Sequence, residues 1–193
     1  MAASRSSRTT SVTRHREVAA RVTELLGRVA ITRRADDKRG FDHGTFVPLY
    51  VVYPDAEVPL LQLSLQADYD PEAHLAVGRA LAPLRDEGVL ILGSGLSYHN
   101  LRALGPEGAE PSRRFDGWLT ETLCDQPPDE RTRRLIAWEQ APAARLCHPS
   151  EDHLIPLMVA VGAAEHDHGT RTYHEDTMNR SITVSSYRFG ALA

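Results

Sequence analysis

The chain has 193 residues, of which 41% are hydrophobic and 25% are charged, and its formal net charge is -4. This length and composition predict one globular domain with a proper hydrophobic core. The negative charge gives no general attraction to nucleic acid or to an anionic membrane, and no apolar run approaches the ~18 residues of a membrane span, so we expect neither partner.

Residues 1–14 differ in composition from the rest of the chain. They are rich in Ser, Thr and Arg, contain no acidic residue and carry almost no large apolar side chain. Such a segment is typical of a disordered tail, with a transit peptide as the alternative reading, and it lacks the apolar stretch of a secretory signal. We therefore predict a tail over residues 1–14 and a single domain over residues 15–193.

The first part of this domain contains three apolar segments. From Glu17 to Val29 the apolar residues recur on one face at helical spacing, which predicts a helix. The apolar middle of residues 41–54, around Pro48, is expected to be buried. Residues 58–65 alternate between apolar and polar side chains and are therefore predicted to form a strand.

The next part is predicted to be a helix that leads into a strand. Asp70 and Pro71 are typical of a helix start, and Gly88 is typical of a helix end. Residues 89–92 are apolar without interruption, as in a buried strand. The strand runs into "GSGLSYHN", residues 93–100, where a glycine turn would deliver a histidine to the carboxyl edge of the sheet.

The remainder is predicted to be mainly helical. We expect helices over residues 115–123 and 129–140 and a further helix with Ser150 as its N-cap, while residues 181–189 are predicted to form the last strand. Because strands and helices alternate, we predict an α/β fold, in which helices flank a central mixed sheet.

The two cysteines, Cys124 and Cys147, do not form a CxxC motif. Two cysteines cannot build a disulfide framework, so we interpret both as buried small hydrophobes. The same reasoning favours the reducing cytoplasm as the location of the protein.

Nine histidines include the candidate functional residues. Five lie in polar or helical-surface contexts and are expected to be solvated: His15, His74, His166, His168 and His174. The others are His43, beside a glycine, His99, after the glycine turn, and His148 and His153, which bracket "HPSEDH" at a helix start. Imidazole is a common metal ligand and the natural acid or base near pH 7.

Several interpretations of these four histidines are possible. Spacing alone favours a functional site and satisfied, partly buried histidines equally, and Glu151 or Asp152 could supply a ligand or support one. A serine hydrolase that uses Ser94 or Ser97 is a weaker alternative, because "GSGLS" lacks the GxSxG pattern.

Four longer segments carry a resemblance to a known family. They are "RGFDHGTFVPLYVVYPDAEVPLLQLSL", "GVLILGSGLSYHNLRAL", "HPSEDHLIPLMVAVGAA" and "VSSYRFG". In this order they are similar to the class III extradiol ring-cleavage dioxygenases, in the DOPA 4,5-dioxygenase-like branch of the protocatechuate dioxygenase beta-subunit superfamily. The resemblance covers residues 17–189. It implies an α/β fold, cleavage of a small catechol with O2, and a mononuclear iron(II) site in which zinc often occurs.

The resemblance also implies roles for three histidines. His153 would be a metal ligand, His99 would be the acid/base beside the metal, and His43 would contact the substrate or bound oxygen. His148 is not assigned a ligand role. The implied partners are a small aromatic diol and O2, with a homo-oligomer or a complementing chain as a further expectation.

The sequence departs from the family at its start. Family members carry a further N-terminal segment with two more histidine ligands, which this sequence does not match, and a facial iron site needs three protein ligands. Three explanations are open: a truncated dioxygenase, a split site that another chain completes, and a non-catalytic remnant that acts as a binding or oligomerisation module. The intact histidines favour the first. Missing strands would expose apolar surface, so we expect low solubility or oligomerisation.

Overall fold

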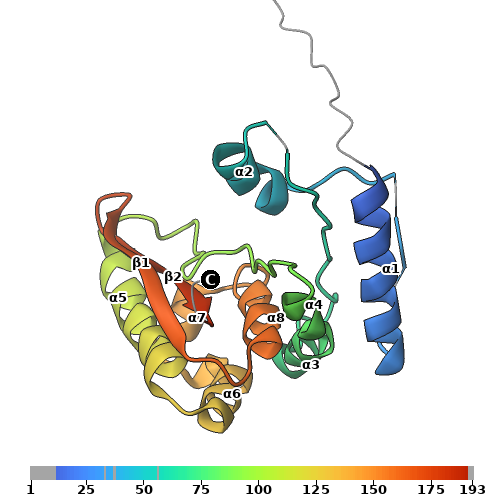
Figure 1. The fold of residues 1–193 in the computed structure, drawn as a ribbon. Helices are drawn as coiled ribbons and strands as arrows, with labels where there is room; N and C mark the ends of the chain where they lie inside the picture. Colours follow the sequence, from blue (N-terminus) through green and yellow to red (C-terminus); the bar gives the residue numbers. More distant parts are fainter. Residues whose placement is uncertain (1–11, 33, 37, 56, 191–193) are drawn as a thin grey trace, which may run out of the picture. The chain divides into compact units, whose positions relative to one another are not determined.

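The computed structural model describes residues 12–32, 34–36, 38–55 and 57–190 (Figure 1). They form two compact units that divide between Ser64 and Leu65. Most of the tail predicted over the first fourteen residues lies outside the described part of the chain, and it stays a prediction. Among the described helices, none is both long and apolar enough to cross a lipid bilayer.

The first unit contains two helices, α1 (Val12–Arg28) and α2 (His43–Val52). α1 confirms the helix that the apolar spacing of residues 17–29 predicts. α2 starts where the Asp42 side chain accepts a hydrogen bond from the Thr45 backbone N–H at 3.1 Å. This N-cap satisfies one of the donors that the first turn of a helix leaves unpaired.

Two expectations for this region are wrong. The apolar segment around Pro48 is not buried: α2 has no buried residue, and Tyr50 and Val51 are 73% and 76% exposed. Residues 58–65 have no regular secondary structure, because no strand of the described residues pairs with them. An apolar pattern indicates that burial of a segment is favourable, but it does not identify the surface or strand against which the segment packs.

The second unit holds the remaining helices. They are α3 (Pro71–Leu81), α4 (Pro83–Asp86), α5 (Pro106–Thr120), the π-helical turn Glu121–Asp125, α6 (Pro128–Ile136), the 3-10 turn Trp138–Gln140, α7 (Ala144–Cys147) and α8 (Ile155–Ala163). Asp70 caps α3 by accepting a hydrogen bond from the Glu72 N–H at 2.9 Å, and Gly88 has a φ of 78 just after α4. Both predicted boundaries of this helical region are therefore confirmed.

Helices α3 and α8 lie side by side (Figure 1) and approach closely at glycines. A Cβ atom at Gly78 would lie 2.2 Å from the Val159 carbonyl oxygen, and one at Gly162 would lie 2.2 Å from the Leu75 carbonyl oxygen. Real Cβ atoms do not approach that closely, so the two glycines permit this helix contact. Leu75 and Met158 are fully buried near this contact.

The sheet is a ribbon of two antiparallel strands, β1 (Gly169–Met178) and β2 (Ile182–Phe189), with Gly169 opposite Phe189. The α/β class is confirmed, but the described residues contain this small antiparallel sheet and not a central mixed one. The strand predicted for residues 89–92 is wrong, since the segment has no ladder partner and Leu90 is 80% exposed. β1 is not among the predicted strands, because most of its residues are exposed and its sequence has only a weak apolar–polar alternation.

The core of the second unit lies where α5 packs along the ribbon and α8 lies beyond it (Figure 1). Its fully buried side chains include Phe115, Leu119, Met158 and Ile182. Cys147 is buried in this core and Cys124 is partly buried, and both are free thiols. The core fixes α7 and α8, and the connection between these helices carries the candidate site.

Candidate functional site

The glycine turn, residues 93–100, runs alongside the connection between α7 and α8. Backbone and side-chain hydrogen bonds join the two segments: Leu96 N–H to His153 O (3.1 Å), His99 N–H to Cys147 O (3.0 Å), His148 Nε2 to Ser97 O (3.0 Å) and Asn100 Nδ2 to Leu146 O (2.8 Å). The Ser97 hydroxyl also accepts a hydrogen bond from the Ser185 N–H of β2 at 3.0 Å. Hydrogen bonds to neighbouring segments therefore hold residues 93–100 in place, although these residues belong to no sheet of the described structure.

The glycines of this segment allow the close approach. A Cβ atom at Gly95 would lie 2.1 Å from the His153 carbonyl oxygen, and one at Gly93 would lie 2.5 Å from the Pro156 carbonyl oxygen. Any larger residue would push the turn away from the α7–α8 connection. The glycines thus allow a close approach of two backbones in addition to a turn.

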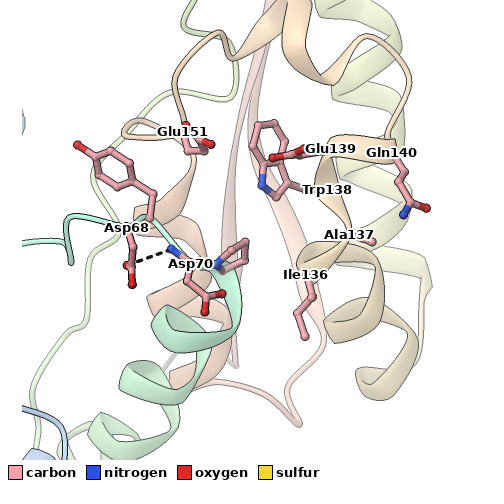
Figure 2. Close-up of a pocket in the computed structure, with 10 residues that line it drawn as sticks. Asp68, Asp70, Ile136, Ala137, Trp138, Glu139, Gln140 and Glu151 are labelled. Carbon is pink, nitrogen blue, oxygen red and sulfur yellow. Dashed lines mark hydrogen bonds between the residues drawn. The ribbon is translucent and has the colours of Figure 1, made fainter.

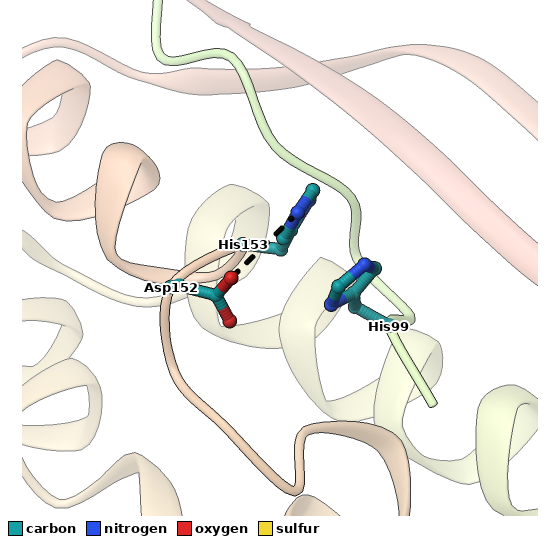
Figure 3. A group of neighbouring side chains, drawn as sticks. All are labelled: His99, Asp152 and His153. Carbon is teal, nitrogen blue, oxygen red and sulfur yellow. Dashed lines mark ion pairs between the residues drawn. The ribbon is translucent and has the colours of Figure 1, made fainter. Parts of the chain in front are cut away.

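His99, Asp152 and His153 form a cluster (Figure 3). The imidazole rings of His99 and His153 are stacked, with their centres 3.4 Å apart and their planes 20° apart. Asp152 Oδ2 lies 3.8 Å from His153 Nε2. One potential ligand atom from each of the three residues lies within 4.8 Å of the others. The structure thus brings His99 and His153 together, as predicted, and adds a carboxylate.

The donor set of this cluster fits a transition metal such as iron(II), because two imidazoles and one carboxylate are the ligands of facial non-haem iron sites. The stacking of the rings restricts how they bind. The lone pair of an imidazole nitrogen lies in the ring plane, so two stacked, nearly parallel rings direct their lone pairs within two separate planes. In this arrangement, one of the two histidines can coordinate a metal while the other lies against it.

His148 is fully buried and has a structural role. Its Nε2 donates to the Ser97 carbonyl oxygen, and its ring packs against Phe115 and Trp138, with centres 5.2 and 6.1 Å apart. Burial lowers the pKa of His148 to about 4, so the ring is neutral at pH 7. The buried His148 ring therefore joins the glycine turn to the connection between α7 and α8.

Two further expectations about this region are corrected. α8 begins at Ile155 with Leu154 as its N-cap residue, so Ser150 is not the cap, because a separate turn precedes the helix. His74 is buried and not solvated: its Nδ1 lies 2.6 Å from the Asp70 carbonyl oxygen, and its Nε2 accepts a hydrogen bond from the Gln66 N–H. The helical pattern of residues around His74 did not reveal that this face lies under a loop.

The other histidines are where the sequence places them. His166, His168 and His174 are exposed, whereas His15 lies outside the residues whose side chains are described. His43 is the first residue of α2, in the first unit, and its side chain is exposed. Its predicted role near the substrate stays a prediction.

The second unit also has an open pocket of about 340 Å³ (Figure 2). It is lined by Tyr69, Trp138 and several carboxylates, one of which belongs to Glu151. Most of these carboxylates already have structural partners: Asp70 caps α3, and Glu139 and Glu151 accept hydrogen bonds from Arg145. The pocket is therefore a polar surface beside the turn that carries the cluster and not a second candidate centre.

Sequence reasoning named Asp152 only as an alternative and missed the residues that hold the cluster. The adjacent letters "DH" were the signal for Asp152. No sequence signal marks the carbonyl oxygens of Cys147 and His153, which accept the hydrogen bonds from the glycine turn. Main-chain partners become visible only when the fold brings distant segments together.

Comparisons with known proteins identify the family of the chain. Residues 6–190 match the family model described as "Catalytic LigB subunit of aromatic ring-opening dioxygenase". The chain is 38% identical over 177 residues to "4,5-DOPA dioxygenase extradiol" of Beta vulgaris, covering 90% of this chain and 65% of that protein. It is 37% identical over 183 residues to "Dioxygenase tasH" of Hapsidospora irregularis, covering 86% and 53%.

A solved structure is also similar. The crystal structure of an uncharacterized protein from Escherichia coli K12 superposes with a TM-score of 0.75 and 30% sequence identity, and the match covers 90% of this chain and 72% of that one. The chain thus shares its fold with this protein, and it spans 65% or less of the length of the two curated relatives above.

Proposed function

The chain belongs to the family of the catalytic LigB subunit of aromatic ring-opening dioxygenase, and on this premise we propose that it is an extradiol dioxygenase that cleaves a small catechol with O2. The stacked pair of His99 and His153 with Asp152 beside it is the observation that carries the proposal. Relatives named 4,5-DOPA dioxygenase extradiol, from Beta vulgaris and Mirabilis jalapa, support a catechol as the substrate.

His153 and Asp152 are the residues that would hold iron(II), which zinc could replace. Iron(II) would supply a Lewis acid that binds both catechol oxygens and O2. His153 is better suited than His99, because the Asp152 carboxylate lies beside its Nε2 and would add an oxygen ligand on the same side. The carboxylate would also balance part of the positive charge of the metal.

His99 is then the acid/base of the reaction. A catechol hydroxyl must lose a proton before the ring is attacked, and a proton must return to an oxygen atom later. His99 is held on its backbone by the bond to Cys147 O and on its ring by the stack with His153, so its ring nitrogen stays beside the metal ligands. Imidazole exchanges a proton readily near pH 7.

The test is ring cleavage by the purified chain. The protein is loaded with iron(II) without air, mixed with L-DOPA or catechol and then exposed to air, while oxygen uptake and the yellow semialdehyde product are followed. We expect both signals in the loaded protein and neither in protein treated with a chelator. Absence of both signals at saturating iron would contradict the proposal for this chain by itself and leave a split site or a binding module as the alternatives.

A further inference from the structure

Arg145, on α7, contacts both the 3-10 turn that precedes α7 and the turn that precedes α8. Its Nη2 donates hydrogen bonds to Glu139 and, at 2.7 Å, to Glu151 Oε1. Its guanidinium carbon lies 4.6 Å from the centre of the Trp138 ring. Trp138 is fully buried, so the flat guanidinium rests on a fixed part of the core and extends from it to Glu151.

Glu151 accepts the backbone hydrogen bonds that close the turn before α8. Its carbonyl oxygen accepts hydrogen bonds from the Leu154 and Ile155 N–H groups at 2.8 and 2.9 Å, and its side chain is held by Arg145. The backbone and the side chain of Glu151 are therefore both anchored. Asp152 and His153 are the next two residues, so the directions of their side chains depend on how Glu151 is held.

The cluster is supported from two sides. The glycine turn holds the His153 carbonyl oxygen through the Leu96 N–H, and Arg145 holds Glu151. The first support is made by backbone atoms and no substitution removes it cleanly. The second is made by side chains, so its effect on the cluster can be measured by substitution.

The exposure of this ion pair indicates that it serves orientation and contributes little to stability. The side chains of Arg145 and Glu151 are 41% and 25% exposed. Ion pairs this open to water contribute little to the stability of the fold. Removing this ion pair should leave the fold intact and loosen the turn.

We propose that Arg145 is a positioning residue that acts through Glu151 to fix Asp152 and His153 against His99. Its consequence for turnover rests on the proposed function, but the orientation of the rings is a property of the metal-free protein. A reacting group displaced by ~1 Å can lose a factor of ~100 in rate, so a small loosening of this turn has a large effect.

The first test is histidine NMR on the metal-free chain. Stacked rings shift each other's signals, so the ring protons of His99 and His153 report directly on the stack. Arg145→Ala should move both sets of signals towards those of unstacked imidazole, and Glu151→Gln, which keeps the size of the side chain, should move them part of the way. Arg133→Ala removes the exposed Arg133–Glu130 pair on α6 and should move neither.

Unchanged His99 and His153 signals in Arg145→Ala would overturn the proposal. If that variant does not fold, Glu151→Gln decides in the same way, and Arg145→Lys, which retains one ion pair, should give an intermediate shift.

The second test is turnover by the iron-loaded chain with L-DOPA. Arg145→Ala should lower kcat by about 10- to 100-fold with little change in KM, while Arg133→Ala should match the parent. An unchanged kcat in Arg145→Ala overturns the positioning role. If the parent itself does not cleave the ring, the proposed function fails, and the NMR result still decides the role of Arg145.

Discussion

At the scale of single residues, the stacked histidines His99 and His153 are expected to have different roles in the reaction. His153 has the Asp152 carboxylate 3.8 Å from its Nε2, whereas His99 is tied by its backbone to Cys147 O. His153→Ala should therefore lower bound iron and activity together. His99→Ala should keep most of the iron and slow turnover by ~100- to 10,000-fold, the usual contribution of a general acid/base.

Iron content by metal analysis and kcat, measured on the same samples, check this division. His166→Ala is the control, because His166 is exposed and outside the cluster. An equal loss of iron in His99→Ala and His153→Ala would show that both rings are ligands, and the stack would then have to open when metal binds.

The buried ring of His148 predicts a dependence of stability on pH. Burial lowers its pKa from 6.5 to about 4 in the folded chain, so between these values the unfolded chain binds the proton more readily. The free energy of unfolding should therefore fall as the pH is lowered from 6.5 to 4, by on the order of 3 kcal/mol from this one group.

Urea unfolding of the parent and of His148→Gln, at several pH values, isolates this contribution. The difference between the two proteins should shrink as the pH falls, because glutamine does not titrate. The exposed His166→Gln serves as the control and should keep a constant difference from the parent. A pH-independent difference for His148→Gln would mean that the ring is already charged or solvated.

Gly95 predicts a second effect on stability at this scale. Its missing side chain leaves room for the His153 carbonyl oxygen, which a Cβ atom would approach to 2.1 Å. Gly95→Ala should destabilise the fold by about 1–3 kcal/mol, as overpacking usually does. Gly117→Ala, in α5, should instead stabilise it by about 0.5–1 kcal/mol, because no atom lies within 4 Å of that Cβ position.

Denaturant unfolding of both glycine variants provides the check. Effects of the same sign would contradict the close approach of the two backbones. For Gly95→Ala, the signals of the stacked rings should change as well, since the turn moves away from His153.

At the scale of elements, a buried arginine joins α6 to the loop between α8 and β1. Arg131 donates hydrogen bonds to the carbonyl oxygens of Glu165 and Asp167 at 2.5 and 2.8 Å, and its guanidinium lies over the Phe189 ring. Two further arginines hold the side chains of the same loop residues, Arg79 on Glu165 and Arg85 on Asp167. Through these arginines, the loop that leads into β1 is bound to the three helices α3, α4 and α6.

Arg131→Met should cost about 1–3 kcal/mol, because it leaves the partly buried carbonyl oxygens of Glu165 and Asp167 without this donor. The exposed Arg133→Ala, two residues later on the same helix, should change stability by no more than about 0.5 kcal/mol. Unfolding free energies and hydrogen exchange of the loop amides measure the contrast. Equal stabilities of the two variants would show that the loop is held without Arg131.

At the scale of the whole molecule, each unit exposes apolar side chains. The first unit exposes Tyr50 and Val51 on α2, and the second exposes Leu90 and Leu92 next to the glycine turn. Apolar surface of this kind favours association with another surface. We therefore expect the chain to self-associate as its concentration rises.

Sedimentation velocity over a concentration series tests this expectation. Val51→Lys and Leu90→Lys together should shift the chain towards the monomer without lowering its unfolding midpoint. Tyr173→Lys replaces an exposed aromatic residue of β1 outside both surfaces and is the control. A monomer at every concentration, or the same association in the double variant, would contradict the role of these surfaces.

The sequence by itself determined the class of the fold, the family and the pair of histidines. The two boundaries of the helical region between Asp70 and Gly88 were predictable, because caps and glycine stops act within one turn of the chain. His99 and His153 were predictable because each sits in a motif of distinctive local letters. Caps, glycine stops and short motifs depend on residues close together in the chain, so they can be recognised without knowing which residues are neighbours in space.

Only the tertiary structure decided which segments meet. Residues 89–92 have the composition of a strand, but a strand exists only where another backbone pairs with it, and in the described residues none does. The helical pattern around His74 predicts a solvated side chain, yet His74 is buried under a loop, whereas His99 stacks on His153. Contacts between segments far apart in the chain depend on packing of the whole unit, and no local pattern encodes them.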